Sequence, residues 1–140
     1  MKRIMMGLSL VILLTGCSSE LLFTEVNMNH VNKDVTEFMN DVQGENGAYL
    51  YHDNKWDMYI FLNGINVVQG SKALHFTDAN IATDGDTLKI FFQHDFTDDY
   101  SDQSLNFQQL YKLTLDKTYD KIMIFDNDEE TSFQGIVLGD

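Results

Sequence analysis

Hydrophobic and polar positions follow two different periods along this chain, and the first of them is helical. Within residues 29–43 the apolar side chains recur at helical spacing and form one stripe: Val31, Val35, Phe38, Met39 and Val42. Asn29 suits the N-cap position, and Gly44 suits the residue that ends the helix. The opposite side is polar and net acidic, so we predict an amphipathic helix that packs on a sheet rather than on a membrane.

From residue 48 onward the period changes to two, which is typical of strands. The apolar runs cover residues 48–52, 56–62, 65–69, 73–83, 87–92, 105–115, 121–125 and 131–138. Asn63-Gly64 and Asp84-Gly85 are strong hairpin signals, and no helical pattern separates the strands. We therefore predict an α+β, mainly β fold in residues 29–140. Its one N-terminal helix would pack on an antiparallel sheet of about seven short strands, as a small sandwich or an open barrel.

One predicted strand, residues 56–62, is apolar on both faces. Tyr59 and Phe61 alternate with Met58, Ile60 and Leu62, so the strand should be central and covered on both sides, with the helix on one of them. The neighbouring aromatic residues are Tyr49, Tyr51 and Trp56. Packing in the core is the expected role of these rings, and a ligand or peptide groove is the alternative.

The first residues are typical of a bacterial export signal. Lys2 and Arg3 precede an apolar run over residues 4–14, which is too short to span a bilayer and has the length of a signal-peptide core. Leu14-Thr15-Gly16-Cys17 follows and resembles the lipobox of bacterial lipoproteins. An ordinary secretory signal with an incidental cysteine is the alternative.

The lipobox resemblance implies a covalent lipid on Cys17, a diacylglycerol with acyl chains such as palmitate, and cleavage just before this residue. Residues 1–16 would be the signal peptide and residues 17–28 the lipidated N-terminus and tether. We expect Leu21-Leu22-Phe23 to pack on the domain, and a position in the headgroup region is the alternative. The protein would be held at the extracytoplasmic face of the cell membrane.

Charge narrows the range of partners. The chain has a net charge of −13, and removal of Lys2 and Arg3 leaves 7 lysines against 22 acidic residues, or 7 − 22 = −15. Such a chain repels nucleic-acid phosphates and anionic headgroups, so we expect no nucleic-acid partner and no polybasic membrane attachment. The acyl chains must then supply the anchor.

Acidic residues gather after the predicted strand 87–92. Asp95, Asp98, Asp99 and Asp102 place four carboxylates in eight residues, which is enough oxygen to bind Ca²⁺ weakly. The segment lacks the EF-hand pattern, and a solvated acidic loop explains it equally well.

Two histidines form the other candidate site. Pairing residues 73–83 with 87–92 around Asp84-Gly85 would set His75 opposite His94, as a shared metal site or a pH-sensitive pair. Two half-exposed strand histidines are the alternative.

Motifs for catalysis are missing from the sequence. It has no GxSxG, SxxK, GxGxxG, Walker or HExxH pattern, and its single cysteine is assigned to lipid. We therefore expect no nucleotide and no cofactor beyond the covalent lipid and weak Ca²⁺, and an enzyme is the less favoured interpretation.

Three functions remain open at this point, and the third of them is an inhibitor or immunity-type lipoprotein that would use its acidic face against a basic enzyme. The first is a non-catalytic binding module that takes a protein or cell-wall partner. The second rests on a resemblance: lipobox, helix, Tyr-rich β domain and the loop Thr97-Asp98-Asp99-Tyr100-Ser101 resemble small lipoproteins of Bacillus-type bacteria labelled peptidyl-prolyl isomerases. That resemblance implies an extracytoplasmic folding factor, although no isomerase signature residues can be assigned.

Overall fold

A computed structural model describes residues 20–139, which form one helix and nine strands. The helix is α1 (Lys33–Val42). The strands are β1 (Leu22–Glu25), β2 (Gly47–His52), β3 (Asp57–Asn63), β4 (Ala73–Asp84), β5 (Thr87–Thr97), β6 (Gln108–Thr114), β7 (Lys121–Asp126), β8 (Glu129–Thr131) and β9 (Gly135–Leu138).

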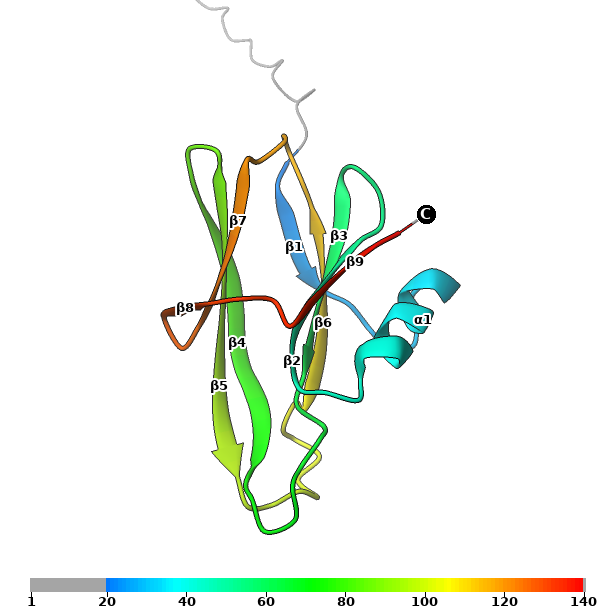
Figure 1. Cartoon of the computed structure of the whole chain (residues 1–140), viewed down its shortest axis with the longest axis vertical. Coiled ribbons are helices and arrows are strands. Elements are labelled where there is room, and N and C mark those ends of the chain that lie inside the picture. Colours follow the sequence, from blue (N-terminus) through cyan, green and yellow to red (C-terminus); the bar gives the residue numbers. More distant parts are fainter. Residues whose placement is uncertain (1–19, 140) are drawn as a thin grey trace, which may run out of the picture.

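The strands form two sheets, which stack as a sandwich (Figure 1). One sheet has the order β1-β6-β3-β2-β9, and the other has the order β4-β5-β7-β8. The helix lies on the outer face of the five-stranded sheet (Figure 1). The molecule therefore has three layers with two apolar interfaces between them.

The predicted fold class is wrong. Instead of an α+β domain with one antiparallel sheet of about seven strands, residues 20–139 form a mainly β sandwich of nine strands in two mixed sheets. Parallel pairs join β2 to β9 and β5 to β7. The chain passes between the sheets through loops rather than helices, and side-chain alternation does not encode the direction in which a strand runs.

Element boundaries also differ from the predicted ones. The helix begins at Lys33, and its N-cap is Asn32 rather than Asn29, because Asn32 Oδ1 accepts a hydrogen bond from Val35 N at 3.0 Å. Residues 65–69 form no strand. Residues 22–25, assigned to the tether, form β1 and pair with β6.

The central strand is as predicted. β3 lies between β6 and β2 and carries alternating side chains into both apolar interfaces. Met58, Ile60 and Leu62 face the second sheet, whereas Tyr59 and Phe61 face α1, which buries Val35, Phe38 and Met39 against them. The aromatic residues Tyr49, Tyr51 and Tyr59 are thus core residues, each less than 7% exposed.

Asn63 and Gly64 connect elements instead of making a hairpin. Asn63 is fully buried, and its Nδ2 donates to Gln43 O at 3.0 Å and to Glu45 O at 2.9 Å, which ties the end of α1 to the sheet. A Cβ on Gly64 would lie 2.6 Å from Leu74 O, so only glycine fits there. The identity of Asn63 is therefore explained by its burial, and that of Gly64 by the close approach of the Leu74 backbone. From here the chain crosses to β4 in the other sheet.

β1 is an edge strand of the five-stranded sheet, next to β6. Phe23 stacks on Tyr111 with ring centres 4.7 Å apart, whereas Leu22 is half exposed. Packing on the domain is thus confirmed for Leu21 and Phe23, and not for Leu22.

Tyr111 provides an alkaline stability prediction. Burial is the main cause that raises the pKa of Tyr111 from 10.0 to about 12, and its hydroxyl donates to Gln109 Oε1 at 2.8 Å. The folded chain therefore holds this proton more tightly than the unfolded chain, so its contribution to stability is complete below pH 10.0 and is lost as the pH rises through about 12. We expect urea unfolding of Tyr111→Phe to depend less on pH across this window than that of the wild type. Equal pH dependence of both proteins would contradict the assignment.

Candidate functional site at the distal loop end

Two loops form the end of the sandwich farthest from the start of β1 (Figure 1). Residues 64–72 connect β3 to β4, and residues 98–107 connect β5 to β6. Gly64 N donates to Phe107 O at 2.8 Å, and Phe76 N donates to Asn106 O at 2.8 Å. These backbone bonds fasten the two loops to each other and to β4; we call this region the distal end.

An apolar pocket opens at the distal end. It has a volume of about 260 Å³ and is lined by Ile65, Val67, Ala73, Tyr100 and Phe107. Large apolar side chains are also exposed on the two loops and the adjoining end of β5. We call four of them the distal apolar patch: Ile65 (42% exposed), Val68 (75%), Phe96 (53%) and Tyr100 (50%).

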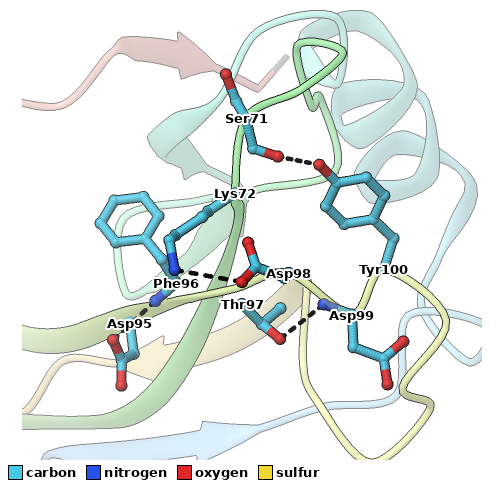
Figure 2. Close-up of polar contacts among 8 residues, drawn as sticks. All are labelled: Ser71, Lys72, Asp95, Phe96, Thr97, Asp98, Asp99 and Tyr100. Atoms are coloured by element: carbon cyan, nitrogen blue, oxygen red, sulfur yellow. Dashed lines mark hydrogen bonds and ion pairs between the residues drawn. The ribbon is translucent and has the colours of Figure 1, made fainter.

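Polar contacts hold the aromatic part of this patch in place (Figure 2). The hydroxyl of Tyr100 donates to Ser71 O across the two loops. Beside it, Lys72 Nζ forms an ion pair with Asp98 Oδ2 at 3.4 Å. The phenol ring is thus fixed at its outer end by a loop-to-loop bond, and Tyr100 is one of the residues that line the pocket.

The four predicted calcium ligands lie here, and each has a carboxylate oxygen that accepts a hydrogen bond or forms an ion pair within the distal end. Asp95 Oδ1 accepts from Phe96 N at 2.8 Å, and Asp98 faces Lys72 (Figure 2). Asp99 Oδ1 accepts from Ser101 N at 3.1 Å. Asp102 Oδ1 accepts from Ser104 Oγ at 2.6 Å and from Ser104 N, and these bonds hold the pKa of Asp102 below its ordinary value.

Asp99 and Asp102 are thus arranged like Asp side chains that stabilise turns by bonding to the backbone two residues further on. Within residues 20–139, no three His, Cys, Asp or Glu side chains come together in a group that could hold a metal ion. Calcium binding by Asp95, Asp98, Asp99 and Asp102 stays a prediction.

The structure does not bring His75 and His94 together. The β4–β5 hairpin forms, but its two turn residues are Gly85 and Asp86, because Asp84 pairs with Thr87, and the register shifts again between Phe76 and Asp78. His75 consequently pairs with Asp95, and His94 pairs with Phe76, which puts the two imidazoles on opposite faces of the sheet. His75 is 8% exposed and edge-on to Phe107, whereas His94 Nδ1 is hydrogen-bonded to Asp126 Oδ1.

Sequence reasoning missed the distal apolar patch. Ile65 and Val68 were assigned to a strand whose alternation would have buried one face. The adjacent pair Val67-Val68, followed at once by Gly70-Ser71, was the available signal, because two neighbouring apolar residues before a turn do not fit a half-buried strand.

Comparison with known proteins gives one match, at the N-terminus. The family described as prokaryotic membrane lipoprotein lipid attachment site matches residues 1–18, which include Cys17. No curated protein and no solved structure matches the chain. Cys17 itself lies outside the described residues.

The match supports a lipoprotein held at a membrane by a lipid anchor. It lends no support to the resemblance to Bacillus-type lipoproteins or to the isomerase label. Within residues 20–139, no helix has the length and apolar character needed to cross a bilayer.

Proposed function

We propose that this lipoprotein sits on the extracytoplasmic face of the cell membrane and binds a protein partner through its distal end. The observation that carries the proposal is the distal apolar patch. Two of its four large apolar side chains, Ile65 and Tyr100, line the pocket, at the end of the sandwich opposite the start of β1. Exposed apolar clusters with a polar rim are typical of protein interaction sites.

The pocket favours an apolar side chain as its occupant. Its lining is formed by aliphatic and aromatic residues, and its volume of about 260 Å³ suits one large side chain rather than a cofactor. A glycan of the cell wall would need convergent polar groups, whereas the polar atoms nearest the pocket, the Tyr100 hydroxyl and Ser71 O, already bond to each other. A protein segment with an exposed Leu, Met or Phe fits this chemistry.

The charges around the patch indicate which charged residues the partner should present. Asp95, Asp98 and Asp99 are exposed beside the patch, and the nearby Lys72 is already paired with Asp98. The whole chain carries a net charge of −13, so acidic surfaces are repelled. The partner should therefore present Lys or Arg next to the apolar side chain.

Matched variants test the proposal on the lipidated protein in nanodiscs, with membrane-fraction proteins as the source of partner. Val68→Ser should weaken retention of the partner roughly tenfold, because it removes the apolar contact made by the most exposed side chain of the patch. Ile136→Ser changes another exposed apolar side chain, which is 59% exposed on β9, and should leave retention unchanged.

The charge requirement has its own matched pair. Asp98→Asn with Asp99→Asn should weaken retention, whereas Glu129→Gln with Glu130→Gln on β8 removes the same charge and should not. Equal effects of the distal and control variants would refute a distal binding site. Acceleration of a protease-coupled prolyl-peptide assay by the wild type would instead favour the isomerase.

A further inference from the structure

Exposed apolar side chains also gather at the end of the sandwich where β1 begins. Leu22 is 50% exposed, Trp56 is 42% exposed and Leu138 is 73% exposed. The sheet register places them along the same end of the five-stranded sheet: Leu22 pairs with Thr114, which pairs with Asp57, and Leu138 pairs with His52 at the other side of the β2–β3 turn. We call this region the anchor end (Figure 1).

The short stretch of chain between Cys17 and β1 keeps the anchor end close to the lipid. From Cys17 to Leu22 the chain advances 22 − 17 = 5 residues. At a maximum of about 3.5 Å per residue, Leu22 lies within roughly 18 Å of the residue that carries the acyl chains. The side chains of the anchor end are thus confined next to the bilayer, whereas the distal end is the opposite end of the long axis.

Trp56 is held in a rigid turn at this end. Asn54 Oδ1 accepts from Trp56 N at 2.9 Å and from Asp57 N at 3.0 Å, and Trp56 O accepts from Leu115 N at 2.8 Å. The Lys55 ammonium lies 5.0 Å from the centre of the indole ring. An indole beside a cation combines an apolar body with groups that suit the headgroup region, where Trp is enriched in membrane proteins.

We propose that the anchor end rests on the bilayer surface, with Trp56 and Leu22 in the headgroup region as a second point of attachment. The lipid on Cys17 keeps this end at a high effective concentration near the membrane, so a small apolar contact is enough to orient the domain. With two points of attachment, the long axis of the sandwich points away from the membrane, and the distal end faces outward. This inference rests on the lipid anchor and is independent of the distal partner.

The lipid that suits this surface is one of low net charge. Asp53, Asp86, Asp116 and Asp120 lie in the turns at the same end and outnumber Lys55 and Lys117, so this end opposes an anionic surface. We therefore expect contact with phosphatidylcholine, and weaker contact as phosphatidylglycerol is added.

Fluorescence tests this directly, because Trp56 is the only tryptophan in the chain. The lipidated protein is reconstituted in phosphatidylcholine vesicles, and only protein that floats with them is measured. Vesicles with brominated acyl chains should quench roughly half of the emission, most strongly when the bromine is close to the headgroup. Added phosphatidylglycerol should reduce the quenching.

A matched control moves the fluorophore to the other end. The double variant Trp56→Phe with Phe96→Trp keeps one tryptophan per chain, in the distal apolar patch, and should show no bromine quenching. Unquenched Trp56 in floating wild-type protein, or equal quenching of both proteins, would overturn the proposal. Loss of the distal partner would not affect either result, so the two proposals fail separately.

Discussion

Cys17→Ala is expected to abolish incorporation of an alkyne fatty acid into this protein. The thiol is the only one in the chain, and it lies within the lipid attachment site matched at residues 1–18. Alanine offers no atom that can carry a diacylglycerol, so the expected effect is complete loss of label. Metabolic labelling followed by gel fluorescence of the purified protein measures it.

Ser18→Ala is the control for this experiment, since it changes the next residue and leaves the thiol intact. It should label like the wild type. The uncleaved Cys17→Ala precursor can remain at the membrane through residues 4–14, so labelling is a cleaner measure than fractionation. A wild type without label would show that the first residues are an ordinary secretory signal.

Phe61→Ala is expected to lower the free energy of unfolding by about 3–5 kcal/mol, which is typical for a large buried side chain cut to alanine. Phe61 is 1% exposed and lies between α1 and the five-stranded sheet. Its ring is edge-on to Phe38, with centres 6.3 Å apart, and 6.5 Å from Tyr49. Removing it leaves a cavity under the helix, and urea denaturation measures the cost.

Phe96→Ala is the matched control, because Phe96 is 53% exposed in the distal apolar patch. It should change the free energy of unfolding by no more than about 0.5 kcal/mol. A loss of less than about 1 kcal/mol for Phe61→Ala would mean that the helix does not depend on this packing.

Local patterns in the sequence were enough to predict much of the fold. The alternation across Met58–Leu62 predicted a central strand with two apolar faces, and the stripe of Val35, Phe38 and Met39 predicted what covers one of them. Asp84-Gly85 predicted a hairpin between β4 and β5, which forms one residue further along, at Gly85-Asp86, because a tight turn depends mainly on local residues.

The remaining features depend on contacts that are distant in the sequence. The parallel pairing of β2 with β9 joins segments some eighty residues apart, and no local period records it. The turn at Gly85-Asp86 and the extra residue at Thr77 together set a register that separates His75 from His94. Asn63-Gly64 has the composition of a hairpin turn, but its role is set by Gln43, Glu45 and Leu74.

The candidate site shows the same limitation. The acidic residues of the loop were visible in the sequence, whereas the pocket appears only where Ile65 and Tyr100 meet from two separate loops. Of the two ends with exposed apolar residues, the anchor end follows from the position of Cys17, and the distal end follows from the fold. Under the two proposals, the sandwich separates membrane contact from partner contact along its long axis.

The most direct test of partner binding is photocross-linking in cells that make the lipoprotein. A photoreactive amino acid replaces Gln69, which is exposed beside Val68, or Asn80, which is exposed on β4. The position at Gln69 should give one discrete protein adduct, in which the cross-linked peptide contains Lys or Arg next to an apolar residue, and the position at Asn80 should give none. No adduct from Gln69, the same adduct from both positions, or an adduct with glycan or lipid would contradict the proposal that the distal end binds a protein.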